Sequence, residues 1–190
     1  MTTATAVPLR LVSTPRVGSK VSARAIKLRS GAAADAAHIH ALVLDHLEEG
    51  HLLPRTLEEI SAHVTRFVVA EHRGEVIGCA ELAPLSSTVA EIRSLVVSRD
   101  ARGVGLSRRL INELVHRATV AGYHKLCAFA YSPAYFVRLG FSIVPHQWLP
   151  EKIVTDCHSC PHFRQCGQYA VMHPLTRTRE ACVPLAALHG

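Results

Sequence analysis

The stretch LVVSRDARGVGLSRRL, residues 95–110, contains the signal that decides the fold. Its first three residues are apolar and typical of a buried strand, whereas the residues from Leu106 onward follow a helical pattern. Between them, Gly103 and Gly105 interrupt both patterns and indicate a turn. A strand that leads through such a turn into a helix presents unpaired backbone N–H groups and the positive end of the helix dipole at one point. The stretch therefore predicts an anion-binding turn suited to phosphate.

This turn differs from two well-known phosphate-binding motifs. It lacks the Gly-Lys-Ser/Thr of a P-loop, which argues against a nucleoside-triphosphatase. It does not fit a dinucleotide fingerprint either, because the strands before it form an antiparallel run and do not open a βαβ unit. On these residues alone, an ordinary strand-to-helix loop remains the alternative interpretation.

The composition is that of one globular domain. The chain has 190 residues, of which 48% are hydrophobic and 19% charged. The formal net charge is +6, but the basic residues are scattered and no aromatic–basic cluster accompanies them. This favours an anionic small molecule over nucleic acid as the partner. No window reaches about 18 uninterrupted apolar residues, so we expect no membrane span.

The two ends of the chain are expected to lie outside this domain. The first 24 residues contain four basic residues, many Ser and Thr, and no acid. They predict a disordered leader, with a transit-peptide composition as the alternative. We expect the globular domain to span residues 25–176, with a cysteine-bearing loop at 157–166, and residues 177–190 to form a C-terminal tail.

Local patterns give an order of strand, two helices, three strands, helix, strand, helix and two strands. Ser30 is expected to cap the first helix, and Thr56 and Glu59 form a capping box for the second. Arg73-Gly74 reads as a hairpin turn, and Gly122 ends the long helix that follows Gly105. The fold class is therefore α+β, with a mixed, mostly antiparallel central sheet and helices on both faces. The strands are expected at 25–28, 66–72, 75–82, 89–97, 125–131, 141–144 and 168–175, and the fourth helix at 132–139.

This order, together with the segment Arg102-Gly103-Val104-Gly105-Leu106-Ser107, resembles the GNAT family of acetyl-coenzyme A-dependent N-acetyltransferases. The family motif is Arg/Gln-x-x-Gly-x-Gly/Ala, and Ser107 departs from it by adding a side chain at the second small position. The resemblance implies a GNAT fold with acetyl-coenzyme A (acetyl-CoA) as cosubstrate. It implies that the strand backbone holds the pantetheine arm and that the turn amides hold the pyrophosphate. The implied cofactor-binding residues are Leu95, Val96, Val97, Arg102, Gly103, Val104, Gly105, Leu106 and Ser107.

A narrower resemblance rests on four segments: GHLLPRTLEEI, AEIRSLVV, FAYSPAYFVRLGF and LPEKIVTDCHSCPHFRQCGQYAVM. Together they are similar to the short, stand-alone N-acetylglutamate synthase-like acetyltransferases over roughly residues 25–175. Such enzymes acetylate the α-amine of glutamate at the entry to arginine biosynthesis. The resemblance thus implies an amino-acid N-acetyltransferase with L-glutamate as acceptor.

Transfer of an acetyl group to an amine requires a base for the amine and an acid for the departing thiolate. Period-two alternation predicts that Glu91, Arg93, Leu95 and Val97 share one face of their strand, so Glu91 is the base candidate, through a water molecule. The alternatives are a structural partner for Arg93, and Glu81 as the base.

The acid is harder to assign from the sequence. Many family members have a Tyr four residues before the Gly of the GF pair, but this chain has Phe136 there. Tyr131 is therefore the acid candidate, followed by Tyr135, with simple packing as the alternative for both.

Three cations are candidates for binding a substrate carboxylate: Arg55, Arg93 and Lys152. They favour an acidic amino acid over a polyamine. Another amino acid, a protein N-terminus, and a non-catalytic module that binds acetyl-CoA remain alternatives, and a homodimer is left open.

The cysteines favour a reducing compartment. Cys79 and Cys127 lie in apolar strand-like runs, where reduced buried thiols are common, so we expect a cytoplasmic protein. Cys157, Cys160 and Cys166 are spaced like part of a zinc knuckle. Because only three cysteines are present there, a reduced loop is preferred over a metal site or a disulfide, and no metal ligand is assigned.

Overall fold

A computed structural model describes residues 25–50, 52–160 and 162–175. The leader predicted for residues 1–24 and the tail predicted for 177–190 lie outside the described residues. A seven-stranded sheet runs through the molecule in the order β1-β2-β3-β4-β5-β7-β6, and every neighbouring pair is antiparallel except β4 and β5. The predicted α+β class and mixed, mostly antiparallel sheet are confirmed. The strands are β1 (Lys27–Ser30), β2 (Phe67–His72), β3 (Glu75–Pro84), β4 (Val89–Val97), β5 (Lys125–Ala130), β6 (Ser142–Val144) and β7 (Tyr169–Pro174).

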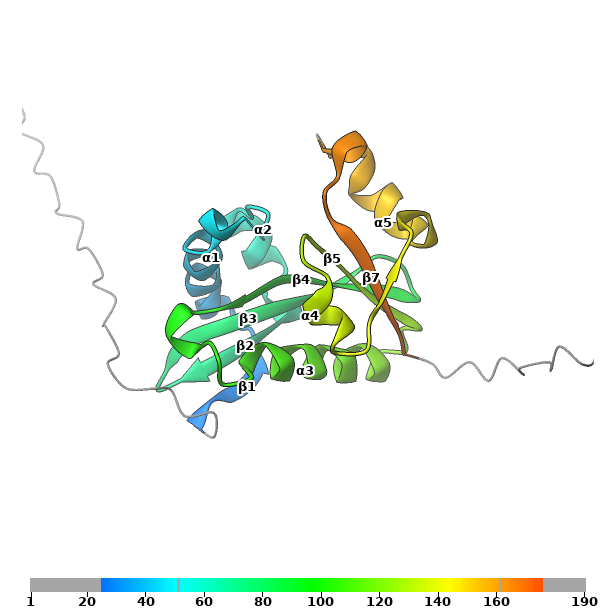
Figure 1. The fold of residues 1–190 in the computed structure, drawn as a ribbon. Coiled ribbons are helices and arrows are strands. Elements are labelled where there is room, and N and C mark those ends of the chain that lie inside the picture. The colour runs from blue at the N-terminus through cyan, green and yellow to red at the C-terminus, as the bar shows by residue number, and fades with distance from the viewer. Residues whose placement is uncertain (1–24, 51, 161, 176–190) are drawn as a thin grey trace, which may run out of the picture.

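Helices cover both faces of this sheet (Figure 1). On one face lie α1 (Ala36–Leu44), α2 (Leu57–Ala62) and α5 (Pro150–Thr155); on the other lie α3 (Leu106–Val120) and α4 (Ala134–Val137). The apolar residues of α1 and α2 pack on β2 and β3 in one core cluster, and those of α3 pack on the opposite face in a second cluster. A third cluster lies beside α5 on β5 and β7. No helix among the described residues is long and apolar enough to cross a membrane.

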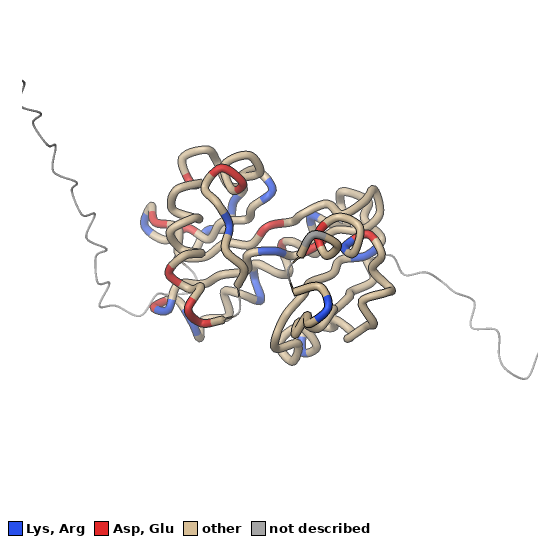
Figure 2. The backbone as a smooth tube through the Cα atoms, turned by 90° about the horizontal axis from the view of Figure 1, so that it is seen from above, with Lys and Arg blue, Asp and Glu red and all other residues tan. Residues whose placement is uncertain are grey.

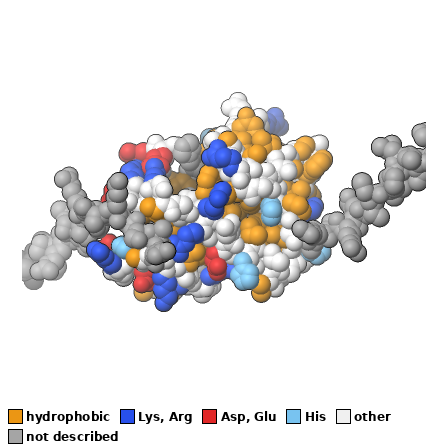
Figure 3. Space-filling view, turned by 60° about the horizontal axis from the view of Figure 1, so that its bottom comes forward, with side chains coloured by type: hydrophobic (Ala, Val, Ile, Leu, Met, Phe, Trp, Pro, Cys, Tyr) orange, Lys and Arg blue, Asp and Glu red, His pale blue; other side chains and the backbone are white. Residues whose placement is uncertain are grey.

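The long helix α3 follows its predicted pattern. Its buried residues are Leu106, Leu110, Ile111, Leu114 and Ala118, which recur at helical spacing on the face toward the sheet. Figure 3 shows the face of the molecule on which α3 lies. Several separate groups of Lys and Arg side chains appear there, with uncharged surface between them, in keeping with the scattered charge of the sequence.

Strands β4 and β5 run side by side only over their first halves. Their register joins Val89 to Lys125 and ends where Ile92 meets Ala128. Beyond that point, Arg93–Val97 of β4 is not paired with β5, although β3 continues to pair with it. The two strands therefore diverge, and β4 presents a free backbone edge toward the opening.

A β-bulge lies in the diverging half of β4. Cys79 pairs with Val96 and Glu81 pairs with Arg93, so one residue of β3 faces two residues of β4, Ser94 and Leu95. Ser94 has a φ of 48°, in the left-handed region that a residue with a side chain seldom adopts. The Cys79 thiol donates a hydrogen bond to the Ser94 carbonyl oxygen at 3.6 Å.

The bulge corrects the prediction about which β4 residues share a face. Arg93 lies on the face covered by α1, α2 and α5, and Val96 packs with α1 and α2. Leu95 and Val97 pack with the α3 cluster instead. The prediction that Leu95 and Val97 share a face with Glu91 is therefore wrong, because the extra residue in the bulge shifts the alternation by one position.

Several helix boundaries also differ from the predictions. The capping box of Thr56 and Glu59 is confirmed at the start of α2. Ser30, however, ends β1 and caps no helix; a short 3-10 turn at Ala33–Asp35 precedes α1 instead. The helix predicted at 132–139 is reduced to α4, without a side-chain cap from Ser132. Helix α5 is not among the predicted elements, because its six residues are too few to give a clear helical period.

Candidate active site

A cleft of about 780 Å³ lies where β4 and β5 diverge. One wall comes from the segment before α2 and from α2 itself, and the other from α5 and the end of β5. Its floor is formed by β3 and β4, and its far end reaches Arg102 and Ser107 beside the glycine turn. Seen from above in Figure 2, charged residues of both signs lie along the middle of the molecule, between the half that carries α1 and α2 and the half that carries α5.

The glycine turn has the backbone form that an anion site requires. Gly103 has a φ of 81° and Gly105 a φ of 76°, so a side chain at either position would be strained. A Cβ at either position would meet nothing within 4 Å, which means that the backbone faces open space. Gly105 is the N-cap of α3, and no side chain caps this helix end. The first amides of α3 therefore remain available to an external acceptor.

The side chain of Arg102, which precedes the glycine turn, is paired with an acidic residue. Its guanidinium donates to both carboxylate oxygens of Glu49, at 2.7 and 2.9 Å, and to the carbonyl oxygen of Val97 at 3.4 Å. This ion pair connects the turn to the 3-10 segment that follows α1. Arg102 is therefore held beside the cleft, with its charge already shared with Glu49.

The fold brings the base candidate Glu91 into contact with two of the carboxylate-binding candidates, Arg93 and Lys152. Glu91 is 3% exposed. Lys152 donates to both of its oxygens at 2.8 Å, and Arg93 donates to Oε2 at 2.6 Å. The Lys152 ammonium also lies 5.2 Å from the centre of the Phe129 ring. Both carboxylate oxygens of Glu91 are therefore engaged by cations.

Asp156 completes this cluster and was missed by the sequence analysis. It follows α5 and accepts hydrogen bonds from Lys152, at 2.8 Å, and from Arg93. Its spacing of four residues from Lys152 is a helical ion-pair signal, but the contact with Arg93 is not local. Burial disfavours the charged form of Arg93, but the negative charges of Glu91, Asp156 and Glu81 and the hydrogen bond to Glu91 together outweigh burial and raise the pKa of the guanidinium.

Arg55 lies on the opposite wall and contacts a different carboxylate. It donates to Oε2 of Glu81 at 3.0 Å and to Glu59 at 3.3 Å. Glu81 is only 1% exposed, although it lines the cleft. The two cations Arg55 and Arg93 thus lie on different elements around one cleft, and each is already paired with acidic side chains.

The tyrosine candidates lie at the other edge of the cleft. Tyr131 follows β5 and is 42% exposed, and Tyr135 lies on α4; both line the cleft. Phe136 packs against Phe141, with 5.3 Å between ring centres, so this position belongs to the core. Phe136 therefore supplies no acid, and Tyr131 is more exposed than Tyr135.

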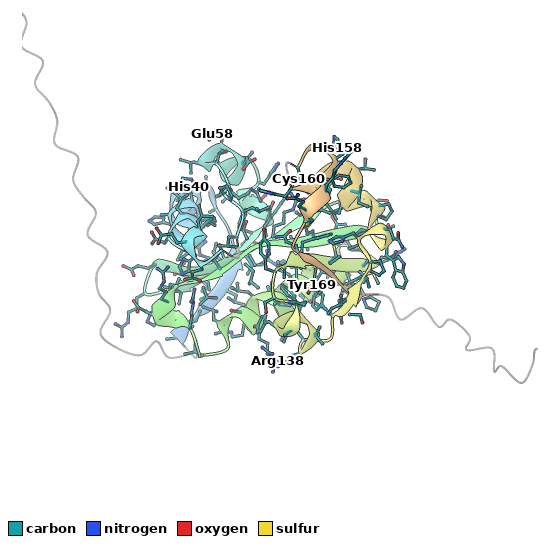
Figure 4. The ribbon with its side chains drawn as sticks, turned by 45° about the horizontal axis from the view of Figure 1, so that its top comes forward. His40, Glu58, Arg138, His158, Cys160 and Tyr169 are labelled. Atoms are coloured by element: carbon teal, nitrogen blue, oxygen red, sulfur yellow. The ribbon has the colours of Figure 1, made fainter. Side chains whose placement is uncertain are left out.

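The cysteines divide into two groups. Burial raises the pKa of the Cys79 thiol to about 12 and also raises the pKa of Cys127. Cys157, Cys160 and Cys166 lie in the segment between α5 and β7, whose position is marked in Figure 4 by His158 and Cys160, across the cleft from His40 and Glu58. Within the described residues, no group of three or more His, Cys, Asp or Glu side chains is arranged to hold a metal ion.

A mixed sheet whose middle strands diverge, a bulge at the opening and an uncapped glycine turn thus lie around one cleft. Residues 35–141 match the acetyltransferase (GNAT) family. The chain is also 31% identical to an uncharacterized N-acetyltransferase of Chlorobaculum tepidum, over 78% of this chain and 96% of that protein. The chain belongs to the GNAT family of acetyltransferases, and its acyl donor is acetyl-CoA.

Two further similarities are more specific. The chain is 30% identical to an amino-acid acetyltransferase of Neisseria meningitidis, over 75% of this chain but 34% of that protein. The solved N-acetylglutamate synthase of Neisseria gonorrhoeae, in complex with coenzyme A and N-acetyl-glutamate, matches 80% of this chain and 35% of its own, with 28% identity and a TM-score of 0.72. The chain therefore spans about a third of the length of these relatives.

Proposed function

We propose that this chain transfers the acetyl group of acetyl-CoA to the α-amine of an amino acid, with L-glutamate as the acceptor. The observation that carries the proposal is the set of three cations, Arg55, Arg93 and Lys152, around one cleft at the β4–β5 opening. The similarity to an N-acetylglutamate synthase that binds N-acetyl-glutamate supports the same acceptor. A cytoplasmic location and a place in arginine biosynthesis form part of this proposal.

The donor side of the proposal rests on backbone geometry. The edge of β4 from Arg93 to Val97 is free of β5 and can hydrogen-bond the amide groups of a pantetheine arm. The amides from Gly103 to Ser107 then hold the pyrophosphate, because the left-handed glycines leave the backbone open at the start of α3. Arg102 adds a positive charge beside this site.

On the acceptor side, the carboxylates of the substrate replace acidic side chains that are paired with the cations of the cleft. A carboxylate of glutamate binds Arg93 and Lys152 in place of Asp156, which is the most exposed acid of their cluster at 35%. The second carboxylate binds Arg55, whose partner Glu59 is 54% exposed. The exchange of one carboxylate for another keeps each of these cations paired with a negative charge.

On the side of the leaving group, Tyr131 is the proposed acid. Its position at the end of β5 borders the opening, and its exposed ring leaves the hydroxyl accessible from the cleft. Thiol release therefore takes its proton from Tyr131, directly or through water.

The acceptor assignment is tested by steady-state kinetics of the variant Arg55→Lys. Lysine keeps the charge but loses the planar fork that binds carboxylates, so the KM for glutamate should rise by about tenfold, equivalent to about 1.4 kcal/mol. The affinity for CoA, measured by calorimetry, should not change. Glutamine is the control substrate, because it keeps the α-carboxylate and lacks the second charge. Equal use of glutamine and glutamate by the unmodified protein would overturn the choice of acceptor.

A further inference from the structure

Glu81 occupies the position in the cleft where the strands diverge. It pairs in register with Arg93, the first residue of β4 beyond the last β4–β5 pair, Ile92 and Ala128. Its neighbour Ala80 faces the two bulge residues. Glu91, by contrast, pairs with Cys127 of β5, in the part of the sheet where β4 and β5 are still hydrogen-bonded to each other. Glu81 is thus the carboxylate next to the bulge, and Glu91 lies further from it.

The two carboxylates also differ in how many of their oxygens are in use. Both oxygens of Glu91 accept hydrogen bonds from Lys152, and Oε2 accepts a further one from Arg93. Glu81 accepts from Arg55 through Oε2. Within the described part of the chain, no hydrogen bond to its Oε1 is found. Each oxygen of Glu91 therefore already has a cationic partner, whereas Glu81 offers an amine in the cleft one oxygen with no hydrogen bond.

We propose that Glu81 is the general base of the reaction and that Glu91 acts as a positioning residue for Arg93 and Lys152. This assignment rests on the proposed function, because it requires an amine acceptor in the cleft. Arg55 holds the Glu81 carboxylate through Oε2, which leaves Oε1 to accept a proton from the amine.

Atoms and protons balance in this reaction. The acceptor enters as an ammonium ion and gives one proton to Oε1 of Glu81. The free amine attacks the thioester carbonyl, a C–N bond forms and the C–S bond breaks. The thiolate takes the second amine proton, through Tyr131 or water, and Glu81 returns its proton to solvent. The net products are an N-acetylated amine, a free thiol and one released proton, and no oxidant or metal is needed.

The ionisable groups around Glu81 come from four elements. Arg55 contacts it from the segment before α2, and Glu59 of α2 shares that arginine. Arg93 lies opposite Glu81 on β4, and the negative charge of Glu81 contributes to the raised pKa of Arg93. Cys79 lies two residues before it on β3, and the negative charge of Glu81 adds to the burial that raises the pKa of this thiol. Only Glu81 among these groups is a carboxylate at the floor of the cleft.

The test compares the pH dependence of kcat/KM for Glu81→Gln and Glu91→Gln. The Glu81→Gln variant keeps an acceptor oxygen for Arg55, but its side-chain amide cannot take a proton. At pH 7 its rate should fall by about 10²-fold. The deficit should narrow as pH rises, because solvent then supplies the free amine. Glu91→Gln should instead raise the KM for the acceptor and leave a deficit that does not change with pH.

Three controls separate catalysis from structure. Glu59→Gln removes the other carboxylate of Arg55 and should keep the pH dependence of the unmodified protein. Glu81→Asp should be slower but keep that dependence, because it retains a base. CoA affinity by calorimetry reports that each variant is folded.

A rate for Glu81→Gln that is unchanged, or lowered equally at every pH, would overturn the assignment. A deficit of Glu91→Gln that narrows as pH rises would return the role of base to Glu91. Lack of thiol release by the unmodified protein with every amine would overturn the proposed function, and this assignment with it.

Discussion

At the scale of single residues, Gly105 links the local backbone to the proposed binding of phosphate. Its φ of 76° requires glycine, and no atom within 4 Å would block a Cβ sterically. Strain and loss of backbone access are therefore separate consequences of a substitution. Gly74, in the β2–β3 hairpin, has a φ of 84° and equally open surroundings. It offers a matched control for strain alone.

We expect Gly105→Val and Gly74→Val to lower the free energy of unfolding by similar amounts, about 1–3 kcal/mol each, because both force a side chain into the left-handed region. Only Gly105→Val should weaken CoA binding, by tenfold or more, since its side chain projects where the phosphate would approach. Denaturant unfolding and calorimetry measure the two effects. Unchanged CoA affinity in folded Gly105→Val would remove the anion site from this turn.

At the scale of elements, the β4 bulge is the feature that sequence patterns could not give. The segment from Glu91 to Val97 reads as unbroken alternation, and no glycine marks the extra residue. The bulge depends instead on Ser94 adopting a left-handed conformation opposite Ala80, with the Cys79 thiol bound to the Ser94 carbonyl. These are contacts between strands, and a single strand's pattern does not contain them.

We expect Ser94→Gly to stabilise the fold. A left-handed residue with a side chain costs about 1–2 kcal/mol, and glycine adds about 0.5–1 kcal/mol of unfolded-state entropy, so the net gain should be about 0.5–1 kcal/mol. Arg73, with a φ of 54° in the hairpin, is the other described non-glycine residue with positive φ. Arg73→Gly should show a similar gain. Thermal unfolding compares the two, and a lower stability of Ser94→Gly alone would indicate that the serine side chain supports the bulge.

At the scale of the whole molecule, the layers follow from the sequence, but the site does so only in part. Periodicity and turn residues predict the order of strands and helices along the chain, the hairpin at Arg73-Gly74 and the buried face of α3. The glycine turn can also be predicted, because its left-handed backbone depends on residues that are adjacent in the sequence. Each of these features depends on residues that are close together in the sequence, so the sequence alone predicts it.

The acceptor side is not local, and it was predicted less well. Asp156 contacts Arg93 across 63 residues of sequence, and Arg55 contacts Glu81 across 26. Both contacts depend on how α5 and the segment before α2 come together over the sheet. The sequence indicates which cations are present, but the carboxylates that hold them become visible only in the folded chain.

The central claim is that this cleft catalyses acetyl transfer from acetyl-CoA to the α-amine of an amino acid. The most direct measurement is thiol release from acetyl-CoA by the purified chain with a panel of amines, with the acetylated product identified by mass spectrometry. The panel contains glutamate, glutamine, aspartate, a neutral amino acid, a polyamine and a peptide with a free N-terminus. We expect thiol release to require an amine, to be fastest with glutamate and to yield N-acetylglutamate. Release with the polyamine or peptide alone, or with none of these amines, would contradict the account.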